Sequence, residues 1–162
     1  GFYAYCVEPQ QSVGSGTFTL DPAFALVPGN IHPTTVLTPA KIASLRLLFG
    51  QVSNPFSPTL DRYVQAAIQV GIWEILRETA STYDVYTGNV RYTGASNATI
   101  LPLAQGFLAN VNNGIGTPKY NILALYNRTL QDVVTDTPEP GTWLLLGLGL
   151  VGIGLHGRRK SA

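Results

Sequence analysis

Residues 57–76 read SPTLDRYVQAAIQVGIWEIL, the longest stretch of helical periodicity in the chain. Apolar side chains recur in it at intervals of three and four residues, which predicts a helix that opens near Pro58. The other side of this helix is apolar too, because it carries Ala66, Val70 and Trp73. A helix that is apolar nearly all round is typical of a protein interior, so this segment predicts the centre of the fold.

Polar side chains form only a narrow line along this helix, at Arg62, Gln65 and Gln69. A buried glutamine amide needs hydrogen-bond partners, because burying it without them costs free energy. Gln69 is therefore expected to lie in a hydrogen-bond network or to be used chemically. Gly71, in the middle of the same helix, lowers helix stability and indicates the close approach of another backbone.

Two further helices are predicted from the residues at their ends. Thr38 followed by Pro39 is typical of an N-cap and a first helical position, and Gly50 closes the apolar run that follows. The other helix is expected from about residue 100 to residue 112, with Gly114 just past its end.

Segments typical of strands occur before and after these helices. Residues 1–9 and 17–27 are rich in aromatic and β-branched side chains and are expected to pair with each other. Residues 83–93 have the pattern of a hairpin turned at Gly88, and residues 119–134 return as extended chain. Strands mixed irregularly with about three helices predict an α+β fold class, with antiparallel β-sheet elements packed against the helices.

The bulk composition indicates one small domain. The chain has 162 residues, of which 45% are hydrophobic and 12% charged. This length and hydrophobic fraction suffice for one domain with a hydrophobic core but not for two domains. The arginines of the body are scattered, which excludes the basic surface that nucleic-acid binding needs. The first residue is Gly1, so we expect a chain processed or truncated at its start, with a secretion signal upstream.

Few residues of this chain are suited to metal binding or nucleophilic catalysis. His32 and His156 lie far apart in the sequence, so we expect no metal site, no cofactor and no Ser/His/Asp triad. Cys6 is the sole cysteine and has no partner for an intrachain disulfide. In an exported protein, such a cysteine indicates a free thiol, an intermolecular partner or special chemistry.

The last two dozen residues have three parts. The tetrapeptide Thr-Pro-Glu-Pro at 137–140 precedes an uncharged apolar run from Trp143 to Leu155, and a basic cluster follows at 158–160. The apolar run is short for a spanning helix, which needs roughly 20 residues, so spanning would require a thinned bilayer. The positive-inside bias would keep the basic cluster in the cytoplasm.

These parts divide the chain into three regions. We expect an extracellular domain at 1–135, a proline-rich linker with the sorting motif at 136–141, and a transmembrane helix with a basic cytoplasmic end at 142–162. The domain would therefore lie outside the inner membrane.

The three-part tail resembles the PEP-CTERM sorting signal of Gram-negative bacteria. The resemblance implies recognition by an exosortase, a membrane enzyme that cuts near the Pro-Glu-Pro triplet. It also implies an exported protein that is anchored in the inner membrane by its tail and then, after processing, lies at the cell surface or outside the cell. The residues of the signal are Pro138, Glu139, Pro140, Arg158, Arg159 and Lys160.

Two short segments of the body carry a second resemblance. They are Tyr5-Cys6-Val7-Glu8 on an early strand and Ile68-Gln69-Val70-Gly71-Ile72-Trp73 on the long helix. Together they resemble the Cys-Gln thioester domains of bacterial surface proteins (the TQXA type), whose pattern is an aromatic-Cys strand and a Thr-Gln-x-Ala-aliphatic-Trp helix. This chain departs from that pattern at Ile68, in place of Thr, and at Gly71, in place of Ala.

The resemblance implies that the thiolate of Cys6 attacks the side-chain amide carbon of Gln69, expels ammonia and leaves an internal thioester. Gly71 belongs to the same motif, and Tyr5 and Trp73, together with Phe2 and Tyr3, would form a supporting pocket that excludes water. An amine or hydroxyl on a surface or matrix would then attack the thioester. Because each molecule reacts once, the protein would not be an enzyme.

Three alternatives stay open at this point. Gln65, one turn earlier, is the fallback acyl partner. The chain could instead be a non-covalent structural protein of the surface or biofilm matrix, with an inert Cys6. A cysteine hydrolase would need a histidine near that thiol, and His32 is a poor candidate.

Overall fold

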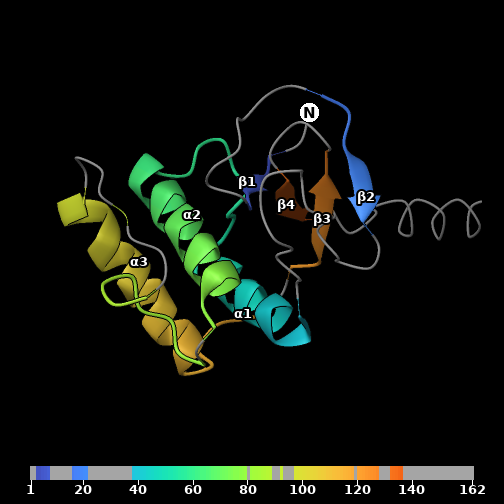
Figure 1. Cartoon of the computed structure of the whole chain (residues 1–162). Helices are drawn as coiled ribbons and strands as arrows, with labels where there is room; N and C mark the ends of the chain where they lie inside the picture. Colours follow the sequence, from blue (N-terminus) through green and yellow to red (C-terminus); the bar gives the residue numbers. More distant parts are fainter. Residues whose placement is uncertain are drawn as a thin grey trace, which may run out of the picture.

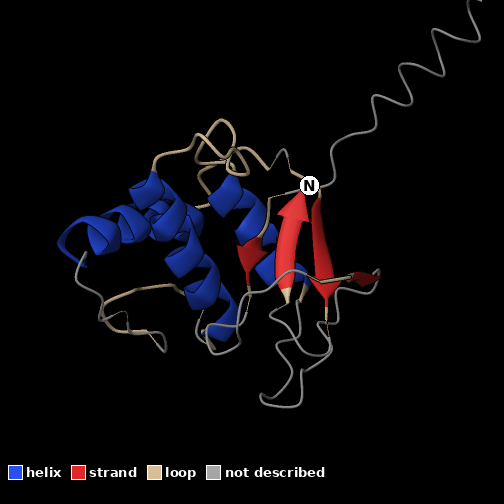
Figure 2. Cartoon of the chain, turned by 90° about the horizontal axis from the view of Figure 1, so that it is seen from above, coloured by secondary structure: helices blue, strands red, loops and turns tan. Residues whose placement is uncertain are grey.

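The computed structural model describes residues 3–7, 16–21, 38–79, 81–88, 92, 97–118, 120–127 and 132–136. Within these residues, three helices pack together beside a four-stranded antiparallel sheet (Figures 1 and 2). The helices gather on one side of the molecule and the strands on the other. The α+β class predicted from the sequence is therefore confirmed.

The first helix, α1, spans Pro39–Phe49, and both of its ends lie where the sequence predicts. Thr38 is the N-cap, and its side chain accepts a hydrogen bond of 3.2 Å from the backbone N–H of Lys41. Gly50 follows the last turn with an ordinary φ of −67°, so no left-handed conformation requires glycine there. A Cβ at Gly50 would lie 2.3 Å from the carbonyl oxygen of Thr117, so glycine is required by the close approach of that backbone.

The long helix, α2, spans Arg62–Arg77 and begins about one turn later than predicted. Asp61 is its N-cap, because the carboxylate accepts hydrogen bonds of 2.8 and 3.2 Å from the backbone N–H groups of Tyr63 and Val64. The preceding residues 57–60 form turns instead. An aspartate N-cap satisfies two N–H groups that the helix cannot pair internally, which explains why the helix starts there.

The third helix, α3, spans Asn97–Asn112 and packs against both α1 and α2. Gly114 lies just past its end with a φ of +67°, in the left-handed region that glycine adopts without steric cost. This glycine terminates the helix as the sequence predicts.

The sheet corrects one prediction. Its strand order is β1-β4-β3-β2, in which β1 is Tyr5–Cys6, β2 is Thr19–Asp21, β3 is Ile122–Tyr126 and β4 is Val133–Asp136. The two N-terminal strands do not pair with each other but lie at opposite edges. Each instead pairs with one strand of the C-terminal hairpin, because that hairpin offers two open edges.

The hairpin expected over residues 83–93 is not found in the described part of that segment, which forms turns at 85–87 and no strand. The side chain of Asp84 accepts hydrogen bonds from the backbone N–H groups of Tyr86 and Thr87, at 2.8 and 3.3 Å. The backbone N–H of Asp84 in turn donates to the buried carboxylate of Glu74, at 3.1 Å. These bonds hold the backbone in turns and compete with strand pairing.

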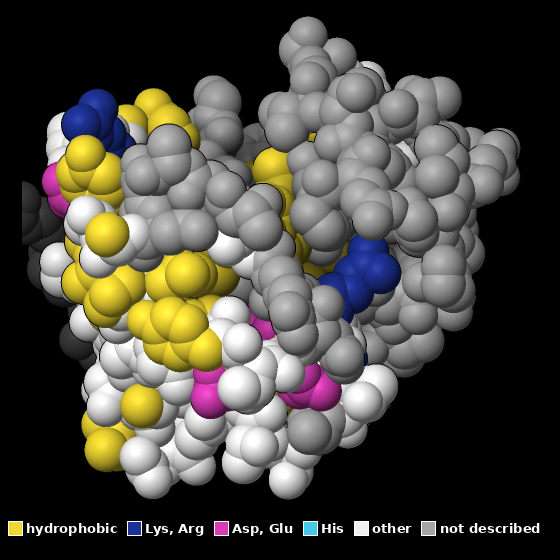
Figure 3. Space-filling view, turned by 60° about the vertical axis from the view of Figure 1, so that its left-hand side comes forward, with side chains coloured by type: hydrophobic (Ala, Val, Ile, Leu, Met, Phe, Trp, Pro, Cys, Tyr) yellow, Lys and Arg dark blue, Asp and Glu magenta, His cyan; other side chains and the backbone are white. Residues whose placement is uncertain are grey.

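The core lies around α2, as its apolar pattern predicts. The fully buried side chains of this helix include Ala67, Ile68, Ile72 and Ile75. On the face in Figure 3, hydrophobic side chains gather over one part, and the few charged ones are of both signs.

The three predicted regions are described only in part. Among the described residues, no helix is long and apolar enough to cross a membrane. The transmembrane helix expected at 142–162 lies outside the described residues, as do residues 137–141 of the linker, His32 and His156.

Candidate functional site

Cys6 lies on β1, at the open edge of the sheet (Figure 1). The next residue, Val7, donates its backbone N–H to the carbonyl of Asp132, at 2.9 Å, and so points toward β4. Successive backbone groups of an antiparallel strand point in opposite directions. The N–H and C=O of Cys6 therefore point away from the sheet.

The side chain of Gln69 from α2 occupies that position. Its Oε1 accepts a hydrogen bond of 2.9 Å from the N–H of Cys6, and its Nε2 donates one of 2.6 Å to the C=O of Cys6. The amide thus takes the place of a neighbouring strand and forms hydrogen bonds with both the N–H and the C=O of Cys6. The two residues on which the thioester prediction depends are 63 positions apart in the sequence and lie in direct contact.

The electrostatics of the site favour a protonated thiol. Cys6 is half-buried, and this burial raises the pKa of its thiol above the ordinary value of 9.0. The described residues include no histidine that could take the proton. Within the described residues, no group of three or more His, Cys, Asp or Glu side chains could hold a metal ion.

The aromatic pocket expected around the thiol is only partly present. Tyr5 faces the helices instead: its ring lies 5.6 Å from that of Phe49, and its hydroxyl donates to the carbonyl of Pro55 at 2.6 Å. Adjacent side chains on a strand point to opposite faces, which separates Tyr5 from the thiol of Cys6. Tyr3 is 57% exposed, and Phe2 lies outside the described residues.

Trp73 and Gly71 lie on different faces of α2. Trp73 follows Gln69 by one turn and shares its face, and the side chain is half-buried. Its indole N–H is buried and has no hydrogen-bond partner among the described residues. Gly71 faces α1, since a Cβ there would lie 3.2 Å from both terminal methyl groups of Leu48, and it does not line the site.

Gln65 is engaged elsewhere. Its Nε2 donates to the carbonyl of Leu60 at 2.8 Å and approaches that of Ser57 at 3.4 Å, both in the segment before α2. Of the two glutamines weighed from the sequence, the structure brings Gln69 to Cys6.

Sequence reasoning did not identify the backbone of Cys6 as part of the candidate site. Its N–H contacts the carbonyl oxygen of the amide that the thiol would attack. The direction of that N–H depends on which strand pairs with β1, and residues 1–9 were expected to pair with residues 17–27. Once β4 is taken as the partner of β1, the alternating directions of the backbone groups along β1 show that the N–H of Cys6 points away from the sheet.

A second side-chain amide in this chain pairs with a backbone in the same way. Asn112 accepts from the N–H of Tyr83 at 3.0 Å and donates to its C=O at 2.9 Å. The arrangement at Gln69 is therefore one of two such pairs among the described residues.

Comparison with known families identifies the tail. Residues 136–160 match the model of the PEP-CTERM protein-sorting motif. The chain carries this sorting signal. It is thus an exported protein with a membrane-anchored signal that an exosortase processes, as the Pro-Glu-Pro triplet and the basic cluster predicted. No curated protein and no solved structure matches the chain.

Proposed function

We propose that this exported protein forms an internal thioester between Cys6 and Gln69 and uses it to attach covalently to nucleophiles of a surface or extracellular matrix. Such a reaction would serve adhesion or the building of a biofilm or exopolysaccharide matrix. The observation that supports the proposal is the pair of hydrogen bonds, 2.9 and 2.6 Å long, that joins the Gln69 amide to the backbone of Cys6.

The first step is an acyl substitution. The sulfur of Cys6 bonds to the amide carbon of Gln69, the C–N bond breaks, and the NH₂ group leaves as ammonia with the proton of the thiol. In the tetrahedral intermediate, negative charge develops on Oε1, which already accepts the N–H of Cys6. A donor in that position stabilises the developing charge.

The other hydrogen bond holds the leaving group. Nε2 donates to the C=O of Cys6, which holds the amide against the backbone of the residue that carries the thiol. When the thiol and the amide are held in one molecule, the reaction needs no bimolecular encounter. This lowers the free-energy barrier of the substitution. The raised pKa of the thiol works against this step, because the thiolate is the better nucleophile.

The second step transfers the acyl group. An amine or hydroxyl of the target attacks the thioester carbon, a new amide or ester bond forms, and the thiol of Cys6 is released with the target's proton. The target becomes tethered through the side chain of Gln69. Each molecule reacts once, so we propose no turnover.

One observation favours a second candidate, a non-covalent structural protein of the surface or matrix. Asn112 pairs with the backbone of Tyr83 as Gln69 pairs with that of Cys6, and Asn112 has no thiol beside it. A side-chain amide can therefore have a purely structural role in this fold. In that case Gln69 only closes the edge of β1, and Cys6 is inert.

The mass of the intact, freshly purified chain distinguishes the two candidates. A thioester makes it lighter than its sequence mass by one ammonia. Cys6→Ala and Gln69→Ala should each abolish that deficit, and the matched control Gln65→Ala should keep it. Treatment with methylamine should add one methylamine to the thioester form only. A full sequence mass in the unmutated chain, with one alkylatable thiol, would overturn the thioester and favour the structural candidate.

The tail gives a separate proposal about processing. We infer that the exosortase cuts near Pro138, Glu139 and Pro140, and that the segment from 142 to 162 holds the chain in the inner membrane until then. Glu139→Ala should leave uncut chain in the membrane fraction, whereas Glu8→Ala should not. Normal release of the Glu139→Ala chain would contradict this inference.

A further inference from the structure

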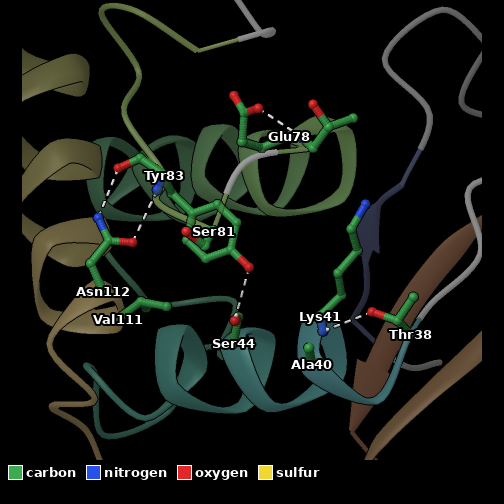
Figure 4. A pocket seen from close by; sticks show the side chains of 10 residues that line it. Thr38, Ala40, Lys41, Ser44, Glu78, Ser81, Tyr83, Val111 and Asn112 are labelled. Carbon is green, nitrogen blue, oxygen red and sulfur yellow. Dashed lines mark hydrogen bonds between the residues drawn. The ribbon is translucent and has the colours of Figure 1, made fainter.

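A polar pocket that Cys6 and Gln69 do not line opens where the start of α1 meets the ends of α2 and α3 (Figure 4). Its volume is about 370 Å³, within the range of small-molecule sites. We propose that this pocket binds one ring of a neutral saccharide. The proposal does not rest on the thioester.

The pocket offers hydrogen-bond donors that have no acceptor among the described residues. Lys41 reaches from α1 to the end of α2, where its ammonium donates one hydrogen bond to the carbonyl of Leu76. An ammonium has three donors, so two have no acceptor among the described residues and can serve a ligand.

Hydroxyl groups add further donors and acceptors. Ser44 and Tyr83 lie 3.0 Å apart, oxygen to oxygen, so one hydroxyl donates to the other and the second keeps its hydrogen. The hydroxyl of Ser81 has no hydrogen-bond partner among the described residues, and its side chain is exposed. A ligand with several hydroxyl groups can both donate to and accept from such a lining.

The charges of the pocket give no net preference for an anionic or a cationic ligand. Lys41 and Glu78 both line it, and their opposite charges offset each other. An anionic ligand would face the carboxylate of Glu78 and the carbonyl end of α2, which carries partial negative charge. A cationic ligand would face the ammonium of Lys41. A neutral ligand avoids both repulsions.

An aromatic ring completes the lining. The half-buried ring of Tyr83 lies within the pocket in Figure 4, and Val111 adds aliphatic surface. A saccharide ring has an apolar C–H face and polar edges, so it can place its face against Tyr83 while its hydroxyls reach Lys41 and Ser44. An apolar ligand would leave these polar groups unsatisfied, which costs free energy.

Saturation-transfer NMR on the full chain in detergent tests the proposal with methyl β-D-glucopyranoside as the neutral probe. D-glucuronate and D-glucosamine serve as its anionic and cationic counterparts. We expect saturation transfer to the neutral probe and a weaker affinity for both charged rings. Cys6→Ala should leave the affinity unchanged, which separates this site from the thioester.

Single-atom variants locate the binding. Tyr83→Phe and Ser81→Ala each remove one hydroxyl and should weaken binding roughly three- to tenfold. The matched control Tyr86→Phe makes the same change on a side chain that is 53% exposed and does not line the pocket, and it should have no effect.

Near-ultraviolet circular dichroism reports whether the Tyr83→Phe variant keeps its fold. If it does not, the binding affinity of the Ser81→Ala variant tests the proposal instead, because that exposed residue is not needed for packing. The proposal is overturned if methyl β-D-glucopyranoside receives no saturation, if either charged ring binds more tightly, or if Ser81→Ala binds as well as the unmutated chain.

Discussion

The side chain of Gln69 accepts one hydrogen bond from Cys6 and donates another to it. This pairing determines how a substitution of Gln69 changes stability. Oε1 only accepts and Nε2 only donates, so the orientation of the amide is fixed by Cys6. A glutamate in this position would keep the acceptor and lose the donor. The substitution therefore separates the contributions of the two bonds.

We expect Gln69→Glu to lower the free energy of unfolding by about 2 kcal/mol at neutral pH, because a carboxylate oxygen would face the C=O of Cys6. The folded state disfavours this carboxylate and so raises its pKa above the ordinary glutamate value of about 4.3; protonation restores a donor, so the loss should shrink as the pH falls from neutral toward about 4. Urea denaturation at pH 7 and pH 4 measures both values.

Gln105→Glu is the matched control for this substitution. Gln105 accepts the N–H of Val85 through Oε1 at 3.0 Å, and a carboxylate can keep that bond. The control should change stability by less than about 0.5 kcal/mol at either pH. Equal losses in the two variants would contradict the pairing described for Gln69.

Tyr5 gives a prediction for alkaline pH. Burial raises its pKa from 10.0 to about 12, so the folded state holds the phenol proton more tightly than the unfolded state does. A raised pKa contributes stability that is fully present below pH 10 and is lost as the pH rises toward 12. Tyr5→Phe should therefore flatten the fall in unfolding free energy between pH 10 and pH 12.

The control for Tyr5 is Tyr86→Phe, at a side chain that is 53% exposed. Urea titrations at several alkaline pH values should give this variant the same steep fall as the unmutated chain. If Tyr5→Phe follows the same curve as well, the phenol of Tyr5 does not control alkaline stability.

Among the elements, the helices were predicted better than the strands. Local residues decide helix ends: Thr38, Pro39 and Gly114 act through bonds or φ values within a few positions. The start of α2 was missed because Asp61 caps it from inside the apolar pattern. Which strands pair depends on segments that are far apart in the sequence, and the local sequence does not specify them. The prediction that β1 pairs with β2 was therefore wrong.

The same limit applied at the site. The motif at Cys6 and Gln69 predicted that these residues belong together, and the structure places them in contact. It did not predict that Tyr5 faces Phe49 or that Gly71 faces Leu48, because those directions depend on how β1 and α2 are oriented in the fold. The thioester itself stays a prediction.

The packing of α2 on α1 can be tested at Gly71. Alanine gains up to about 1 kcal/mol of helix propensity over glycine. At Gly71 the added Cβ would lie 3.2 Å from both methyl groups of Leu48, a fully buried side chain, and overpacking costs about 1–3 kcal/mol. We expect Gly71→Ala to be destabilising by about 1 kcal/mol in urea denaturation.

Gly106 provides the matched control in α3, since a Cβ there would meet nothing within 4 Å. Gly106→Ala should stabilise the chain by up to about 1 kcal/mol. Combining Gly71→Ala with Leu48→Val should cost less stability than the sum of the two single variants, because the shorter side chain makes room for the added methyl group. A stabilising Gly71→Ala would show that α1 yields to the added methyl group.

In the whole molecule, the two ends of the domain build the sheet and the middle builds the helices. β1 and β2 come from the first residues, and β3 and β4 from the last described ones, so the sheet forms only when distant segments meet. Such non-local pairing costs loop-closure entropy before it gains contacts. The sorting signal at 136–160 follows β4 directly, so the last strand of the domain ends where the signal begins.

This arrangement predicts a sharp boundary for C-terminal truncation. A chain that ends after Thr137 keeps β4 and should unfold in urea at the same midpoint as the full chain, since all described contacts lie before that residue. A chain that ends after Asn127 loses β4, which pairs with both β1 and β3 and buries Val134 completely. It would leave Cys6 without its strand partner, so we expect it to lose its near-ultraviolet circular dichroism and its cooperative unfolding transition. If the chain ending after Asn127 unfolds as cooperatively as the one ending after Thr137, the C-terminal hairpin is not the structural centre of the sheet.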